Sequence, residues 1–140
     1  KLDYLERWHE GRRKNAARYR QLFSEAGLVD DPVVLPTEVY AGVDGSDRHN
    51  AHIYNQFVIL VPERDQLLKF LHAREIGCEI YYPLCLHQQE CLRDPAYRAQ
   101  SFPVAERAAA TSLALPIFPE LRDEQLAHVV ETIKAFYHAG

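Results

Sequence analysis

The sequence predicts an α+β (α/β) fold, in which a small, mostly antiparallel sheet carries helices packed on one face. Apolar residues recur at three- and four-residue spacing near both ends of the chain, a pattern that predicts amphipathic helices. Between them, a segment whose side chains alternate between two faces predicts a strand. The 140 residues and the hydrophobic fraction of 47% suit one globular domain. We expect a long connecting helix over residues 1–27 and a small α+β domain over 28–140.

The first predicted element is the long helix, which covers residues 2–26. Gly27 follows it and can adopt the left-handed conformation that commonly closes a helix. The basic residues of this helix could form a nucleic-acid patch, but Glu6 and Glu10 interrupt them, so a solvated helix face is the preferred interpretation. The proline-flanked segment 32–36 then predicts a short strand.

The central predicted strand covers residues 52–61. It follows segment 41–51, whose glycine, serine, aspartate and asparagine residues predict a mobile loop. Because side chains of a strand alternate between its faces, this segment separates core positions from exposed ones. The core face is predicted to carry Ile53, Phe57, Ile59 and Val61, and the other face His52, Tyr54 and Gln56.

The second half of the chain predicts three helices and two short strands. A helix over 63–76, buried through Leu67, Phe70 and Leu71 and closed by Gly77, leads to a strand over 79–82. The connection 84–100 is long for a compact domain, and such loops are usually functional. The remaining elements are an alanine-rich helix opened by Ser101 and Pro103, a strand over 113–118, and a last helix with the apolar stripe Leu126, Val129, Val130, Ile133 and Phe136.

Composition and charge exclude several classes of partner and location. The net charge of −4, without a basic block, argues against nucleic acid or an anionic membrane as a partner. No apolar run approaches the roughly 20 residues that span a bilayer, and no signal-peptide pattern is visible. Three cysteines, an odd number, do not make a disulfide framework. A reducing cytoplasm is therefore the predicted location.

Cysteine and histidine residues raise two alternatives that we do not favour. Cys78, Cys85, His87 and Cys91 could in principle bind zinc or an iron–sulfur cluster, but no Cys-x-x-Cys pair is present. Cys85 and His87 could form a nucleophile and base, yet their spacing does not ensure contact. We interpret the cysteines as small, partly buried thiols and predict no metal site.

The main candidate site combines aromatic and polar side chains of the strand over 52–61 and of the segment that begins at Tyr81. Tyrosine residues in a strand are more often core residues with a satisfied hydroxyl, so the residues alone leave a core role open. The candidate binding residues are Tyr81, Tyr82, His87, His52, Tyr54, Asn55 and Gln56.

Four segments, in this order, resemble the C-terminal third of sugar-nucleotide aminotransferases of the DegT/DnrJ/EryC1/StrS family. Residues 5–23 resemble the helix after that family's catalytic domain, and residues 52–57 its H-x-Y-x-Q-aromatic strand. Residues 81–87 resemble its [HY]-Y-P-x-P-L-H loop, and residues 102–121 its FPxAE…LxLPxxPxL segment. Three positions depart from the pattern and put local loop geometry in question: Glu75 in place of Gly, Cys85 in place of Pro, and Arg122 in place of Ser or Thr.

The resemblance implies the small domain of a fold-type I enzyme that uses pyridoxal phosphate. Transamination from an amino acid, typically glutamate, to a keto-sugar nucleotide is the implied reaction. In that family the Schiff-base lysine and the phosphate cradle lie in a larger N-terminal domain, so we expect no catalytic residue here and an inactive isolated chain. The chain's own lysines, in polar helical contexts, are predicted to be solvated: Lys1, Lys14, Lys69 and Lys134.

The same resemblance implies the partners and the most important binding residue. The large domain of the same protein, a homodimer mate and the sugar nucleotide are the expected partners. Tyr81 matches the position that reaches toward cofactor and sugar nucleotide, whereas His87 has the alternative role of orienting the loop. Two other functions stay open: a non-catalytic binding or regulatory module of the same fold, and a sugar dehydratase that uses the aminated cofactor.

Overall fold

The computed structural model describes residues 2–39, 52–92 and 100–138. Helices and two strands alternate along the chain, which confirms the α+β class. The glycine-rich segment 41–51, predicted as a mobile loop, lies outside the described residues. The elements are α1 (Leu5–Glu25), β1 (Phe57–Leu60), α2 (Arg64–His72), α4 (Pro103–Thr111), β2 (Ser112–Leu115) and α5 (Asp123–His138), with short 3-10 turns at Leu2–Tyr4, Leu86–Gln88 (η3) and Glu90–Leu92 (η4).

The sheet is small and antiparallel, as predicted. β1 pairs with β2 so that Phe57 faces Leu115. Single antiparallel bridges extend the sheet on both sides, Val34 with Leu60 beside β1 and Glu79 with Ala114 beside β2. The strands predicted over 32–36 and 79–82 are therefore present only as these one-residue bridges.

β1 is shorter than the predicted strand over 52–61, and the predicted alternation fails at its start. Tyr54 has a φ of +48°, which interrupts the extended backbone. Its side chain turns into the core and is 2% exposed, whereas Ile53, predicted as a core residue, is 36% exposed. The core and solvent assignments of these two residues were therefore wrong.

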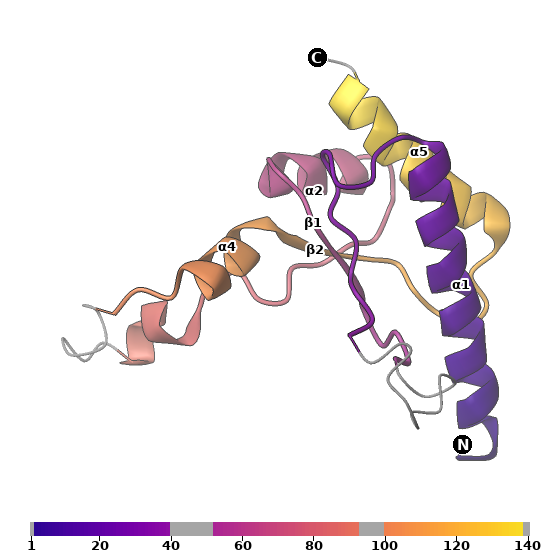
Figure 1. Ribbon diagram of the computed structural model, residues 1–140, viewed down its shortest axis with the longest axis horizontal. Coiled ribbons are helices and arrows are strands. Elements are labelled where there is room, and N and C mark those ends of the chain that lie inside the picture. The colour runs from indigo at the N-terminus through magenta and orange to yellow at the C-terminus, as the bar shows by residue number, and fades with distance from the viewer. Residues whose placement is uncertain (1, 40–51, 93–99, 139–140) are drawn as a thin grey trace.

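Helices α1, α2 and α5 cover one face of the sheet, with α1 and α5 side by side in Figure 1. Arg18 of α1 joins Asp123 of α5 through an ion pair of 2.5 Å. Helix α4 and the turns η3 and η4 project away from the other helices as an arm, comprising residues 84–92 and 100–111 (Figure 1). The core lies between the sheet and helices α1, α2 and α5. Both strands and all three of these helices contribute fully buried side chains to it: Tyr19, Phe23, Phe57, Ile59, Leu67, Leu71, Leu113 and Ile133.

None of the helices within residues 2–39, 52–92 and 100–138 is both long and apolar enough to cross a membrane. Even α1, with 21 residues, carries charged side chains along its length. Its apolar residues are instead directed at the core, where Ala16, Tyr19 and Phe23 are fully buried. This confirms the amphipathic helix predicted over residues 2–26.

Helix α2 ends earlier than predicted and is not closed by Gly77. The N–H of Glu75 donates to the carbonyl of His72 at 3.0 Å, and the N–H of Ile76 donates to that of Leu71 at 3.1 Å. These two bonds are those of a Schellman motif, whose reversing residue is normally glycine in a left-handed conformation. Glu75 is that residue here, with a φ of +59°.

Replacing Glu75 with glycine is expected to stabilise the protein. A side chain in the left-handed region costs about 1–2 kcal/mol, and the greater freedom of glycine in the unfolded chain offsets part of the gain. Glu75→Gly should therefore raise the free energy of unfolding by about 0.5–1 kcal/mol, measured by urea denaturation of the full-length protein.

Gly27 offers the matched control for this experiment, because it closes α1 with a φ of +70° and no atom lies within 4 Å of a Cβ built there. Gly27→Ala should lower the free energy of unfolding by about 1 kcal/mol. Glu75→Ala, which keeps the left-handed strain, should leave stability nearly unchanged. A stabilisation by Glu75→Ala as large as that by Glu75→Gly would instead implicate the carboxylate.

Candidate functional site

A pocket lies where β2, the bridged residue Glu79 and the segment before β1 meet. Its volume is about 210 Å³. Alternation along 78–81 explains its position: Cys78 is buried in the core, so Glu79 and Tyr81 share the opposite, exposed side of the chain. The lining residues are Asn55, Gln56, Gly77, Cys78, Glu79, Tyr81, Ala114, Leu115, Pro116 and Ile117.

Three of the predicted binding residues, Asn55, Gln56 and Tyr81, come together in this pocket. Their side chains supply two amides and a phenol, which can both donate and accept hydrogen bonds. Tyr81 is 44% exposed, so its ring is not a core residue. Tyr82 is 74% exposed and lies outside the lining, with its ring edge-on to that of Tyr81 at 6.0 Å between centroids.

Sequence reasoning missed Glu79, the charged residue of the lining. Backbone bonds to Ala114 fix it in place, with N···O distances of 3.1 and 2.8 Å. Strand alternation could have identified Glu79, because it lies two residues before Tyr81 in an extended segment and so shares its side of the chain.

The Cys78 thiol, behind this pocket wall, is not a reactive group. Burial, together with the nearby Glu79 carboxylate, raises the pKa of Cys78 to about 11. The thiol therefore stays protonated at neutral pH, as expected for a structural cysteine.

His87 lies on the arm and is not among the residues that line the pocket. Its Nε2 is 3.1 Å from Oε1 of Glu106 in α4, and its ring centroid is 4.9 Å from that of Phe102. The same Glu106 oxygen accepts a bond of 2.9 Å from the Phe102 N–H, which together with His87 holds the pKa of Glu106 below its usual value. These contacts support the alternative role, in which His87 orients the loop.

Glu106 thus connects two of the segments that carry the family resemblance. Its backbone N–H donates to the Phe102 carbonyl, while its carboxylate accepts from the Phe102 N–H, so it closes the first turn of α4. Through His87 it also ties the turn η3 to α4. Glu106 and the Phe102 ring beside His87 therefore join the two described parts of the arm.

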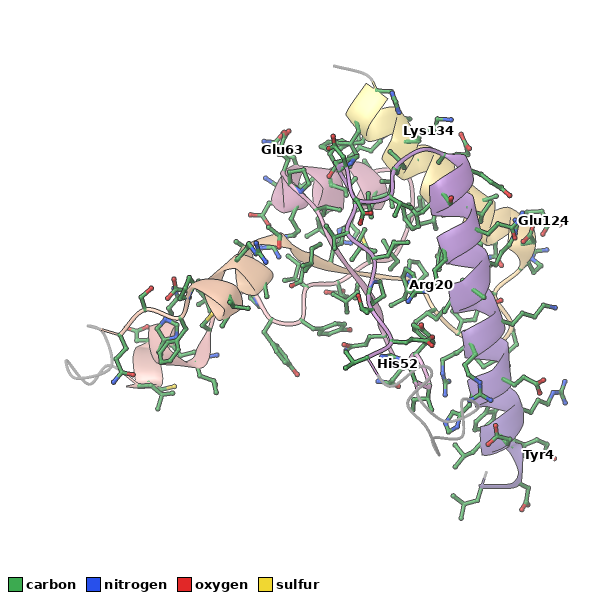
Figure 2. The ribbon with its side chains drawn as sticks, in the orientation of Figure 1. Tyr4, Arg20, His52, Glu63, Glu124 and Lys134 are labelled. Carbon is green, nitrogen blue, oxygen red and sulfur yellow. The ribbon has the colours of Figure 1, made fainter. Side chains whose placement is uncertain are left out.

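His52, labelled in Figure 2, and Tyr54 belong to a different cluster, in which Tyr54 bonds to Arg20 of α1 and the ring centroids of His52 and Tyr54 lie 4.2 Å apart. The Tyr54 hydroxyl bonds to Glu38 and accepts from Nη2 of Arg20 at 3.1 Å. Nη2 of Arg20 also donates to the carbonyl of Pro36. Burial, then the bond with Glu38, raises the pKa of Tyr54. His52 supports the turn, since its Nδ1 accepts from the Tyr54 N–H at 2.9 Å.

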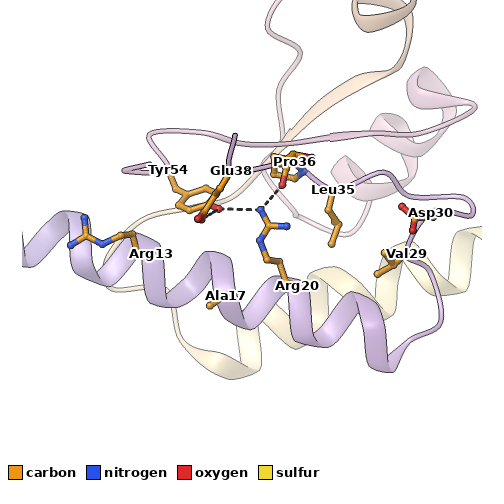
Figure 3. A pocket seen from close by; sticks show the side chains of 10 residues that line it. Arg13, Ala17, Arg20, Val29, Asp30, Leu35, Pro36, Glu38 and Tyr54 are labelled. Carbon is orange, nitrogen blue, oxygen red and sulfur yellow. Dashed lines mark hydrogen bonds between the residues drawn. The ribbon is translucent and has the colours of Figure 1, made fainter. Parts of the chain in front are cut away.

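A second pocket, of about 470 Å³, lies over this cluster, between α1 and segment 29–38. Figure 3 shows Arg20 directed from α1 toward Pro36, Tyr54 and Glu38. The hydrogen bonds among these groups fasten segment 33–38 and residue 54 to α1. Six of the seven predicted residues therefore divide among three places: the pocket of Tyr81, the arm and the cluster of Tyr54. The seventh, Tyr82, lies beside Tyr81 but outside the pocket lining.

The three lysines that the structure describes do not have the surroundings needed for covalent attachment of pyridoxal phosphate. Lys14 and Lys69 are exposed and Lys134 is half-buried, and none of them lines the Tyr81 pocket. A Schiff-base lysine requires an apolar pocket that favours its neutral form. Lys1 lies outside the described residues.

The three cysteines do not gather into one site. Cys78 is buried, Cys85 is partly exposed and Cys91 is exposed. Among residues 2–39, 52–92 and 100–138, no group of three or more His, Cys, Asp or Glu side chains is placed to hold a metal ion. Among the described residues, the ring of His87 hydrogen-bonds to Glu106 and not to Cys85.

Comparison with known sequences gives a consistent relationship over nearly the whole chain. It is 44% identical over 137 residues to a pleiotropic regulatory protein of Geobacillus stearothermophilus, covering 98% of this chain and 34% of that protein. It is 38% identical over 136 residues to a UDP-N-acetyl-3-dehydro-alpha-D-glucosamine 3-aminotransferase of Acidithiobacillus ferrooxidans, covering 96% and 32%. The chain spans about a third of the length of these relatives.

Solved structures agree with the sequence relatives. The aminotransferase TlmJ of Streptoalloteichus hindustanus superposes with a TM-score of 0.79 at 26% identity, over 99% of this chain and 34% of that one. DesV of S. venezuelae, solved in complex with a ketimine intermediate, gives 0.74 at 27% identity, over 96% and 33%. Residues 1–134 also match the family model of the DegT/DnrJ/EryC1/StrS aminotransferases. The resemblance read from the sequence is thereby confirmed, and the chain belongs to the DegT/DnrJ/EryC1/StrS aminotransferase family.

Proposed function

We propose that this chain is the C-terminal domain of a pyridoxal-phosphate-dependent aminotransferase that transfers an amino group, from glutamate, to a keto-sugar nucleotide. In this proposal residues 1–27 form the connecting helix and residues 28–140 the small domain. The observation that carries it is the pocket in which Asn55, Gln56 and Tyr81 converge. Its polar groups suit a ligand rich in hydroxyls, and several relatives are named for reactions on nucleotide sugars.

The proposed task of this domain is to bind and position the sugar. The phenol of Tyr81 and the amides of Asn55 and Gln56 would hold ring hydroxyls and keep the keto carbon in one orientation, which lowers the entropic barrier of the reaction. The lysine and phosphate-binding groups would come from the larger part of the protein. Closure of the two domains would exclude water from the sugar.

We also propose that the complete protein is a cytoplasmic homodimer and that α1 contacts its larger domain. Leu2, Tyr4 and Leu5, at the start of this helix, expose large apolar side chains in the chain described here. A cluster of such residues typically marks a surface that another part of the protein covers. Light scattering of the full-length protein at micromolar concentration should give the mass of a dimer.

The substitution Tyr81→Phe tests the proposed site in the full-length protein. It removes the hydroxyl and keeps the ring. If the hydroxyl contacts the substrate, the enzyme loses that contact, whereas its stability should not change because the ring is exposed. We expect kcat/KM to fall at least about tenfold, equivalent to about 1.4 kcal/mol, with the Tm unchanged. UDP-N-acetyl-3-dehydro-glucosamine, named in the Acidithiobacillus relative, is the first substrate to use.

Tyr137 supplies the control, because its hydroxyl donates to the carbonyl of Pro62 at 2.8 Å, away from the pocket. Tyr137→Phe should lower stability by about 1 kcal/mol or less and leave kcat/KM intact. If Tyr81→Phe behaves like this control, lowering the Tm at constant kcat/KM, Tyr81 has a structural role instead.

A regulatory module of the same fold is the second candidate function, favoured by the name of the Geobacillus relative. A sugar dehydratase is a third, distinguished by histidine in place of the Schiff-base lysine outside this chain. Turnover assays of the full-length protein with glutamate and the keto sugar separate the candidates. Amino-sugar formation supports the aminotransferase, and a deoxygenated sugar supports the dehydratase. Neither product, from a protein that folds, supports the regulatory module.

A further inference from the structure

We propose that Glu79 is a specificity-determining residue, whose carboxylate accepts hydrogen bonds from a neutral sugar ring and disfavours a ring that bears a carboxylate. This inference rests on the proposed function, since it assigns a selectivity to the same pocket. The selectivity concerns the sugar part of the ligand: the pocket would bind a hexose in preference to a uronate.

The position of Glu79 is fixed by its backbone. Two hydrogen bonds pair it with Ala114 of β2, and its neighbour Cys78 is buried on the other side of the segment. Its side chain therefore emerges on the side that carries Tyr81, into the lining that also includes Asn55 and Gln56. Moving the Cβ of Glu79 to the other side of the segment would require breaking the bridge to β2.

Charge distinguishes Glu79 from the rest of the lining. Of the ten described residues that line the pocket, Glu79 is the one with a carboxyl group, and none is a lysine, arginine or histidine. The neutral amides and the phenol do not compensate its charge. A carboxylate accepts hydrogen bonds from hydroxyls more strongly than a neutral acceptor does, and it repels a second carboxylate at a few ångströms.

The size of the pocket indicates which part of a sugar nucleotide Glu79 would sense. Its volume of about 210 Å³ is below the roughly 300–1,000 Å³ of pockets that enclose whole drug-sized ligands. A single sugar ring is the matching unit, with the nucleotide extending outside. The charge of the sugar, and not that of the diphosphate, is then the one nearest to Glu79.

Binding of UDP-glucose and UDP-glucuronate to the full-length protein tests this inference without requiring turnover. The two probes differ only in the group at C6, a hydroxymethyl or a carboxylate. Isothermal titration at low salt should give a Kd for UDP-glucose at least about fivefold lower than that for UDP-glucuronate, the size expected for repulsion in a water-exposed site. Glu79→Gln should reduce this ratio to within about twofold, and added salt should reduce the wild-type ratio.

Glu75→Gln is the matched control, because it removes a carboxylate four residues away that does not line this pocket. Its Kd ratio should equal that of the wild type. If Glu79→Gln binds both probes with the wild-type ratio, the inference about Glu79 is wrong while the sugar-nucleotide site stands. If the folded wild-type protein binds neither probe, the proposed sugar-nucleotide site is wrong, and the inference that depends on it is wrong as well.

Discussion

The isolated chain of residues 1–140, mixed with pyridoxal phosphate, should retain no visible absorbance after gel filtration and show no aminotransferase turnover. Relative to the full-length protein, the isolated chain should lose both cofactor retention and turnover completely. The physical reason is that Lys14 and Lys69 are exposed, so neither offers the apolar surroundings that favour a neutral amine for Schiff-base formation. Helix N-termini and backbone N–H groups that would cradle the phosphate are likewise expected in the larger domain.

The full-length protein is the positive control and should keep its colour through the same column. Weak, reversible adducts of surface lysines are removed by the column, so they do not imitate a cofactor site. Stable colour together with turnover by residues 1–140 alone would contradict the assignment of this chain as one domain of a two-domain enzyme.

Arg64→Ala is expected to cause the largest loss of stability among the substitutions considered. Arg64 is 6% exposed, and its Nη1 donates to the carbonyls of Ala109 at 3.0 Å and Ser112 at 2.8 Å. These carbonyls lie where α4 ends and β2 begins, so the guanidinium both satisfies them and offsets the negative end of the helix dipole. Its removal leaves buried acceptors without a donor and should cost about 3 kcal/mol.

Two further variants separate the contributions to this loss. Arg64→Lys keeps the charge but cannot reproduce the planar set of donors, so it should recover about half of the stability. Asp65→Asn removes the ion pair of 2.6 Å between the exposed Asp65 carboxylate and Nε of Arg64, and should change stability by less than about 1 kcal/mol. Urea denaturation and hydrogen exchange of α4 amides are the measurements. A loss below about 1 kcal/mol in Arg64→Ala would mean that water replaces the guanidinium.

Long helices were predictable from the sequence because their pattern is local and repeated. The predicted helix over 2–26 differs from α1 only at its ends. The apolar stripe predicted for the last helix lies within α5, where most of its residues are buried. Two of the failures occur where one residue departs from a regular backbone, at Tyr54 and Glu75, both with positive φ. Apolar and polar alternation carries no information about such single conformations, which the surrounding packing imposes.

The candidate site was predictable in part, for a related reason. Tyr81, Asn55 and Gln56 meet because β1 and Glu79 both pair with β2, through contacts between segments far apart in the sequence. No local pattern predicts those pairings, so the sequence does not separate Tyr81 from His52 and Tyr54, although Tyr54 bonds to Arg20 of α1. The bonds of Tyr54 with Arg20 and Glu38 are equally long-range.

The pairing of β1 with β2 has a consequence for the order in which the chain acquires structure. Helix α2 and the whole arm lie between the two strands in the sequence, so the sheet forms only after a large loop closes. Contacts of this kind slow folding relative to a helical bundle of the same length. During synthesis on the ribosome, α1, β1 and α2 emerge before β2, so the edge of β1 that pairs with β2 stays open until residues 112–115 leave the exit tunnel.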